Sequence, residues 1–172
     1  MSASSSGQEV FFDAGDIIVS KTDLRGRITY ANKVFCDVAG YSLPELIGQP
    51  HSIIRHADMP RCVFKLLWEY LQRGEEIFAY VKNATRNGGY YWVLAHVTPS
   101  YDAAGAIIGY HSNRRVPKRE TIQNIIAPLY RDLLAEEEKN RNGKEAVAQG
   151  YAALTSFVQS KNIPYDELIF SI

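Results

Sequence analysis

The order of the hydrophobic patterns predicts an α+β fold, in which a five-stranded antiparallel sheet carries helices on one face. Two short strand patterns near the start and three longer ones further on enclose a central stretch with helical periodicity. Neighbouring strands are joined by turn sequences that suit antiparallel hairpins: Asp23-Leu24-Arg25-Gly26, Asn87-Gly88 and Asp102-Ala103-Ala104-Gly105. Two amphipathic stripes after Pro117 predict that a helical hairpin follows the sheet.

The first half of the chain is expected to contain two strands and three helices. The strands are expected at residues 17–22 and 27–30, and from Ala31 the period becomes helical until Gly40. Ser42, with Glu45 three residues later, is typical of a capping box that starts a second short helix. The longest helix is expected at residues 60–73, with a buried stripe made of Phe64, Leu67, Trp68 and Leu71.

The second half is expected to contain strands at residues 76–85, 90–100 and 106–113, and then the helical hairpin. Asn142-Gly143 separates the two helices of the hairpin, and Pro128 is expected either to kink the first helix or to restart it. We therefore expect an N-terminal tail or cap at residues 1–16, a domain at 17–116 and a helical extension at 117–172. Residues 163–172 are apolar enough to pack against the rest.

Composition describes an ordinary globular protein. The 172 residues are 46% hydrophobic, and the 19 basic and 19 acidic residues balance, so no charge excess favours nucleic acid. No apolar run approaches the roughly 18 residues that a membrane span requires. Cys36 and Cys62 are too few for a disulfide framework and lack metal-ligand spacing, so a reduced, cytoplasmic setting is expected. The Ser-rich start at residues 1–8 is expected to be a loose tail.

The most informative stretch is the polar segment at residues 48–60, which precedes the long helix. It holds His51, Arg55, His56 and Asp58 between two prolines. Polar loop residues on a rigid scaffold are where ligand contacts concentrate, although such a segment can also be simply solvated. Arg55 and a protonated histidine suit phosphate oxygens or an anionic ring, and Asp58 can orient Arg55 or cap the following helix.

Strand alternation adds a buried amide to these candidates. Asn83 shares a face with Val81, so an inward face places its carboxamide in the core, where a missing partner costs about 1–3 kcal/mol. The alternative is that Asn83 bridges backbone groups at a strand end. Trp68 is either a core residue, a ligand-cavity wall, or both. His111 can face inward beside a ligand, or it can be a satisfied core or rim histidine.

The sequence motifs in these segments resemble those of PAS domains of the aerotaxis-receptor type over residues 17–115. The resemblance rests on Gly48-Gln49-Pro50-His51, Arg55-His56-Ala57-Asp58-Met59-Pro60, Val81-Lys82-Asn83 and Asn87-Gly88-Gly89-Tyr90-Tyr91-Trp92. It implies a PAS fold that holds FAD noncovalently and reports redox state or oxygen-linked electron flow. It also implies FAD contacts for residues that match in type: Asn32, His51, Arg55, His56, Asp58, Trp68 and Asn83.

Several positions depart from that family pattern. Ala57 stands where proline is usual, Ile77 where a tryptophan is expected, and Ala79 where glycine is expected. His111 and Asn113 replace apolar residues of the last strand. The loss of one aromatic wall puts the retention of FAD in question. The photosensory flavin relatives carry a reactive cysteine in an Asn-Cys-Arg motif. This sequence lacks that motif, which argues against blue-light adduct chemistry.

We therefore expect a non-enzymatic FAD-binding redox or oxygen sensor. The chain contains no recognisable membrane-spanning, kinase, methyl-accepting or DNA-binding segment, so its output is expected to pass to a signalling protein in trans, such as a chemoreceptor or kinase, or through a homodimer. The sequence leaves two alternatives open. One is a ligand-free PAS dimerisation or adaptor module, and the other is a sensor of haem or another small ligand, with His51, His56 or His111 as candidate haem ligands.

Overall fold

The computed structural model describes residues 7–172, and the first six residues of the expected tail lie outside that range. The chain runs through five strands and nine helical elements in this part. In order they are β1 (Ile18–Thr22), β2 (Ile28–Ala31), α1 (Lys33–Ala39), α2 (Leu43–Leu46), the 3₁₀ helix η1 (His51–Ile54), α3 (Arg61–Gln72), β3 (Ile77–Ala84), β4 (Tyr90–Tyr101), β5 (Ile107–Arg115), α4 (Arg119–Thr121), the π-helical η2 (Ile122–Ile126), α5 (Ala127–Glu138), α6 (Gly143–Ser160) and α7 (Tyr165–Ser171).

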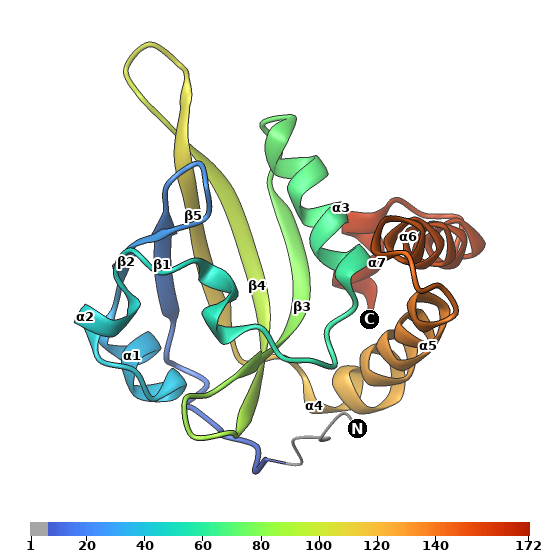
Figure 1. Ribbon diagram of the computed structural model, residues 1–172, viewed down its shortest axis with the longest axis horizontal. Coiled ribbons are helices and arrows are strands. Elements are labelled where there is room, and N and C mark those ends of the chain that lie inside the picture. Colours follow the sequence, from blue (N-terminus) through green and yellow to red (C-terminus); the bar gives the residue numbers. More distant parts are fainter. Residues whose placement is uncertain (1–6) are drawn as a thin grey trace.

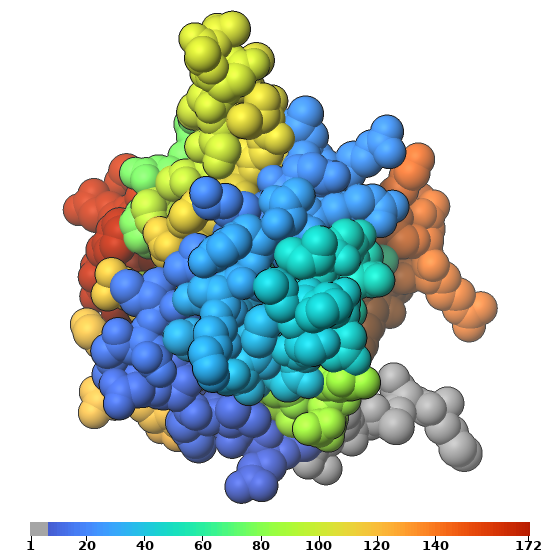
Figure 2. Space-filling model, turned by 90° about the vertical axis from the view of Figure 1, so that its left-hand side faces the viewer, coloured from blue at the N-terminus to red at the C-terminus, as the bar shows by residue number. Residues whose placement is uncertain are grey.

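The five strands form one antiparallel sheet in the order β2-β1-β5-β4-β3, which confirms the predicted α+β fold (Figure 1). Strands from the two ends of the domain meet at its centre, where Ser20 of β1 pairs with Ser112 of β5. The two central strands of the sheet are therefore contributed by segments that lie about ninety residues apart in the sequence. Seen from the β1–β2 side, the first part of the chain forms this end of the molecule, and the β4–β5 hairpin projects above it (Figure 2).

The helices α1, α2, η1 and α3 lie on one face of the sheet (Figure 1). Helix α1 begins at Asn32, whose Oδ1 accepts a hydrogen bond from the Phe35 N–H, and ends at Gly40 in the left-handed conformation (φ 76°). Helix α3 follows Pro60, which offers no side-chain cap, and the chain leaves it through Gly74 (φ 79°). Helix α3 packs between the sheet and α6, and its buried Cys62 side chain lies against Gly150 of α6.

The C-terminal extension contains the expected helix break but one helix more than the hairpin that was predicted. Pro128 lies in the first turn of α5, directly after the π-helical η2. Proline cannot donate a backbone hydrogen bond, which explains why the preceding turns depart from α geometry. Asn142 caps α6, as its place in the break suggests, and residues 163–172 add α7.

The extension packs beside α3 and along β3, the edge strand of the sheet (Figure 1). Tyr130 of α5 donates a hydrogen bond from its hydroxyl to the Tyr80 carbonyl (2.6 Å), and Tyr165 of α7 donates one to the Phe78 carbonyl (2.7 Å). Both carbonyls belong to β3, so the extension satisfies backbone groups that an edge strand would otherwise expose. Within residues 7–172, no helix combines the length and apolarity needed to cross a bilayer.

Candidate ligand-binding site

A cavity of about 280 Å³ lies between the inner face of the sheet and the elements η1 and α3. Its volume is at the lower end of the range of about 300–1,000 Å³ that small-molecule sites occupy. Strands β3 and β4 contribute Val81, Ala95 and Val97, and the exposed side chains of Arg25, Ser52 and Arg55 mark its rim. A mostly apolar hollow with a few polar groups is typical of a binding site for one ring system.

Asn83 lines this cavity from β3, and its predicted inward orientation is confirmed. The buried positions of β3 alternate and include Asn83, which is only 4% exposed. Among residues 7–172, no group pairs with its Nδ2 atom. A buried amide with free donors is costly, about 1–3 kcal/mol, unless a ligand completes its hydrogen bonds.

Trp68 and Tyr110 form an aromatic wall of the cavity. Their ring centroids are 5.3 Å apart and the rings are nearly perpendicular. Trp68 also covers Gly26, where a Cβ atom would lie 3.6 Å from the indole ring. Trp68 is partly buried, packs against the core and lines the cavity, so the two interpretations of this residue hold together.

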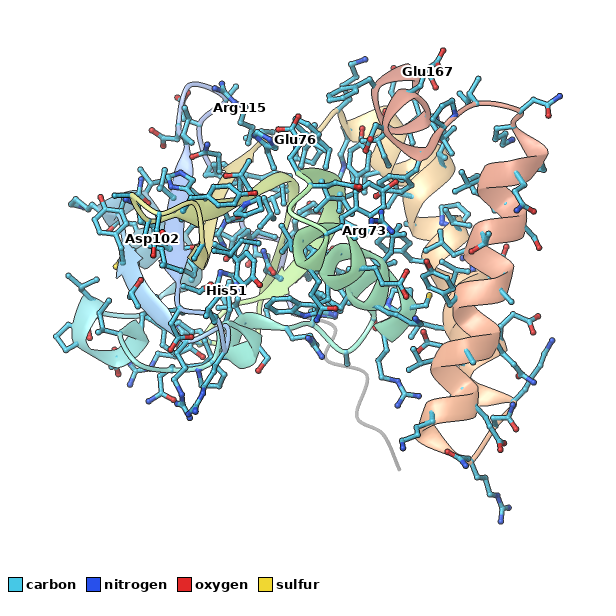
Figure 3. The ribbon with its side chains drawn as sticks, turned by 90° about the horizontal axis from the view of Figure 1, so that it is seen from above. His51, Arg73, Glu76, Asp102, Arg115 and Glu167 are labelled. Atoms are coloured by element: carbon cyan, nitrogen blue, oxygen red, sulfur yellow. The ribbon has the colours of Figure 1, made fainter. Side chains whose placement is uncertain are left out.

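His51 lies on η1, on the side of the sheet that carries the helices (Figure 3). Its Nε2 atom is 3.1 Å from the Ser20 hydroxyl, and its ring stacks on Phe35 with a centroid distance of 5.9 Å. Burial, together with the nearby positive charges of Arg114 and Arg55, lowers the pKa of His51 from 6.5 to about 3. The imidazole is therefore neutral at physiological pH and offers the cavity a dipole rather than a charge.

Arg55 stands at the rim of the cavity, with its guanidinium 4.0 Å from the ring centroid of Phe64. Phe64 is itself a cavity-lining residue of the long helix. The stacking keeps the planar guanidinium in place while its side chain stays exposed, a position that suits an anionic group outside the hollow.

Three predicted site residues, Asn32, His56 and Asp58, are not among the residues that line the cavity. Asn32 uses both ends of its amide on the backbone: Oδ1 accepts from the Val19 and Phe35 N–H groups, and Nδ2 donates to the Ile17 carbonyl. It joins α1 to β1 and thereby supports the cavity wall from outside.

His56 and Asp58 interact with each other instead. The buried His56 accepts a hydrogen bond at Nδ1 from the Asp58 N–H (3.1 Å), and the 61% exposed Asp58 pairs with Lys82 at 2.6 Å. Burial and the charge of Lys82 lower the pKa of His56. The protonated histidine that was expected beside Arg55 is therefore disfavoured.

Of the two interpretations of His111, strand pairing contradicts the inward one and agrees with a histidine at the rim. His111 pairs with Lys21 of β1 and Thr98 of β4, and its Nε2 lies 3.1 Å from the Asn113 Oδ1. Its neighbours Tyr110, Ser112 and Arg114 line the cavity, so strand alternation places the His111 side chain on the opposite face.

Arg114 is the cavity residue that sequence analysis missed. It is 2% exposed, its Nη2 donates to the Ser20 hydroxyl (2.6 Å), and its guanidinium lies 4.3 Å from the Phe35 ring centroid. Burial lowers its pKa to about 10, which still leaves it charged at neutral pH. Arg114 lies beyond the end of the expected strand at residues 106–113, and an arginine next to Arg115 is ordinarily expected in solvent, so no local signal marked it as a cavity residue.

The structure thus combines an antiparallel sheet, helices on one of its faces and a small, polar-ended hollow between the two layers, and comparison with known proteins identifies this fold. The family model described as "PAS fold" matches residues 28–114. The light-state structure of the photoreceptor Aureochrome1 LOV superposes with a TM-score of 0.55 at 23% identity, covering 72% of this chain and 91% of that one. A PAS domain from Colwellia psychrerythraea gives a TM-score of 0.55 at 20% identity, covering 59% and 86%. These structures share the fold.

Among curated proteins, the aerotaxis receptor of Escherichia coli is 42% identical over 132 residues, which are 77% of this chain and 26% of the receptor. The nitrogen fixation regulatory protein of Klebsiella pneumoniae is 31% identical over 60% of this chain and 21% of its own length. The biofilm dispersion protein BdlA of Pseudomonas aeruginosa is 32% identical over 50% and 21%. This chain belongs to the PAS fold family. It is related to sensory and regulatory proteins, and its matches span about a quarter of their length.

Proposed function

We propose that this chain is an FAD-binding redox or oxygen sensor, which signals by conformational change to a partner protein. The observation that carries the proposal is the unpaired amide of Asn83, which lines a ring-sized hollow walled by Trp68 and Tyr110. The polar edge of an isoalloxazine ring presents both acceptors and a donor, which a carboxamide complements. The resemblance to aerotaxis-receptor PAS domains supports the same ligand.

The residues present fit a flavin. Trp68 and Tyr110 would pack on the ring, Asn83 would complete its hydrogen bonds, and Arg55 and Arg25 at the rim would hold phosphate oxygens. When bound, the flavin supplies reversible redox chemistry. Asn32, His56 and Asp58 would act from outside the hollow: Asn32 holds α1 against β1, and the other two shape the segment that carries Arg55.

The signal has two structural routes from the cavity to the C-terminal extension. The first is helix α3, which carries Phe64 and Trp68 and whose first amides donate to Glu137 of α5. The second is β3, which carries Asn83 and whose carbonyls accept from Tyr130 and Tyr165. A change at Asn83 or Trp68 alters strands and helices that the extension contacts directly. The redox state of the flavin can shift the packing of the extension only if the oxidised and reduced forms interact differently with the two conformations of the protein.

The output is proposed to reach a signalling protein in trans, such as a chemoreceptor or kinase in aerotaxis, chemotaxis or a two-component system, from a cytoplasmic homodimer. The names of the relatives support this range, since they include an aerotaxis receptor and a nitrogen fixation regulator. The extension beside α3 supplies the surface through which cavity changes would be transmitted.

The two rival functions have less support. In a ligand-free adaptor, the buried and unpaired amide of Asn83 would lower the stability of the protein with no ligand to compensate for it. For haem, His51 is the one histidine side chain that faces the cavity, and its Nε2 is already close to the Ser20 hydroxyl. His56 does not line the cavity and His111 faces the other side of the sheet.

Retention of FAD tests the proposal. Asn83→Ala and Arg55→Ala should each lower the flavin-to-protein ratio after gel filtration of protein reconstituted with FAD. Asn113→Ala is the matched control, because Asn113 lies on the opposite face of β5 and should leave the ratio unchanged. Ratios that match the wild type in both cavity variants would contradict the assignment of these residues to the site.

A further inference from the structure

Arg114 is a buried cation without an acidic partner. Its Nε and Nη1 atoms have no hydrogen-bond partner among residues 7–172, and its Nη2 donates only to the neutral Ser20 hydroxyl. None of the ion pairs in this part of the chain involves Arg114. Stacking on Phe35 compensates part of the lost hydration.

Such an arrangement is unfavourable for the protein alone. Buried charges are ordinarily paired, and an unpaired one costs several kcal/mol even after relaxation. The groups that the structure places beside Arg114 are neutral at physiological pH: the Ser20 hydroxyl, the imidazole of His51, and the buried hydroxyl of Tyr91, whose pKa is raised to about 12 by burial. The cavity therefore has a fixed positive charge at one end, and no acidic residue within positions 7–172 lines it to balance that charge, so an anionic ligand would supply the partner that the protein lacks.

We propose that Arg114 selects a negatively charged form of the bound ring, and that this residue sets the redox potential at which the sensor switches. This inference rests on the proposed function and names the group that distinguishes the two redox states. Two electrons from a reduced electron carrier and one proton convert an oxidised flavin into its anionic reduced form. The resulting negative charge is the partner that Arg114 lacks.

The same residue is placed to report the change. Arg114 lies on β5, contacts Ser20 of β1 and stacks on Phe35 of α1. A guanidinium that turns toward a newly charged ring would loosen or redirect its bond to Ser20. Strands β1 and β5 are paired at the centre of the sheet and join the two halves of the domain. A change in the redox state of the ring would therefore alter the contacts between these two strands.

The test uses Arg114→Met, Arg114→Lys and the neighbouring control Arg115→Met. Arg115 is exposed and pairs with Leu94, on the face of the sheet away from His51 (Figure 3). The first measurement is the Tm of ligand-free protein. Arg114→Met should raise it, because a methionine removes the buried unpaired charge and keeps most of the volume. A merely structural arginine would give a lower Tm.

The second measurement is the midpoint potential of the FAD-loaded proteins. Arg114→Met should weaken binding of the reduced form at least tenfold relative to the oxidised form, which lowers the midpoint potential by about 30 mV for a two-electron couple. Arg114→Lys should recover part of that shift, and Arg115→Met should show none. A lower Tm together with an unchanged potential in Arg114→Met would overturn the inference while leaving flavin binding intact.

Two further outcomes separate this inference from the proposed function. If wild-type protein takes up no FAD, the proposed function fails first. If it is then stabilised by a small dicarboxylate such as malonate, and Arg114→Met abolishes that stabilisation, the charge serves a carboxylate ligand and the redox role of Arg114 is overturned as well.

Discussion

Glu137 is a buried carboxylate that fastens the C-terminal extension to the cavity-lining helix. It is 3% exposed and accepts hydrogen bonds from the backbone N–H groups of Cys62 (2.8 Å) and Arg61 (3.1 Å), at the start of α3. Pro60 gives α3 no side-chain cap, so Glu137 performs that role from about 75 residues away. Its negative charge also suits the positive end of the helix dipole.

Replacing Glu137 by alanine should destabilise the protein strongly. A hydrogen bond to a charged group contributes about 1.5–3 kcal/mol, and the Cys62 amide is fully buried while the Arg61 amide is partly so. We expect the free energy of unfolding to fall by about 2–4 kcal/mol, with a Tm lower by about 5–15 °C for a chain of this size. Glu137→Gln keeps one acceptor and should cost about 1–2 kcal/mol.

Urea unfolding and thermal melting measure these differences directly. Glu138→Ala is the control, because the neighbouring side chain is exposed and should change stability by less than about 0.5 kcal/mol. In FAD-loaded protein, Glu137→Gln should also increase the rate of flavin release, since α3 carries Phe64 and Trp68. A melting temperature of Glu137→Ala equal to that of Glu138→Ala would refute the assignment of Glu137 as a cap.

Three other substitutions address separate parts of the structure. The pKa of His51 is about 3 in the folded protein and 6.5 ordinarily, so between these values the unfolded chain binds a proton that the folded protein does not. The contribution of His51 to stability is therefore complete above about pH 6.5. It falls by up to about 1.4 kcal/mol per pH unit as the pH drops toward 3. Urea unfolding between pH 7 and pH 4.5 should therefore show a shallower decline for His51→Gln, and parallel slopes would contradict the depressed pKa. Tyr130→Phe should cost about 1–2 kcal/mol, because the Tyr80 carbonyl loses its partner, and amide hydrogen exchange in α5 should accelerate; unaltered exchange would count against a role in docking the extension. Asn32→Ala should cost at least the roughly 0.5–2 kcal/mol of the α1 cap, because it also removes the bonds to Val19 and Ile17, and an unchanged Tm would contradict the role of Asn32 in joining α1 to β1.

The parts of the fold that could be predicted are those that depend on local periodicity. Asn83 and Trp68 were placed correctly because an alternating strand and an amphipathic helix each fix which side chains face the core. Asn142-Gly143 marked the helix break, and Pro128 marked the departure from α geometry just before α5, because capping and the loss of a backbone donor are local properties. Local chemistry thus determined the elements and placed Asn83 and Trp68 in the cavity wall.

The misplaced and missed residues depend on pairing between distant strands. In β5 apolar residues occur on both faces, and a register shift lies between Ser100 and Tyr101 at the start of the β4–β5 hairpin, so alternation did not fix the orientation of His111. Arg114 became a core residue because it pairs opposite Ile18 of β1, a contact across the whole domain. The ion pair of Asp58 with Lys82 likewise joins segments 24 residues apart, and no local pattern encodes it.

The visible absorption spectrum of the purified protein, followed by identification of the chromophore released on denaturation, tests the central claim most directly. The account predicts a flavin spectrum with bands in the blue and near-ultraviolet, release of FAD from the wild type, and a weaker spectrum from Asn83→Ala. A protein that is colourless and takes up no added FAD, or one that shows a haem Soret band, would contradict it.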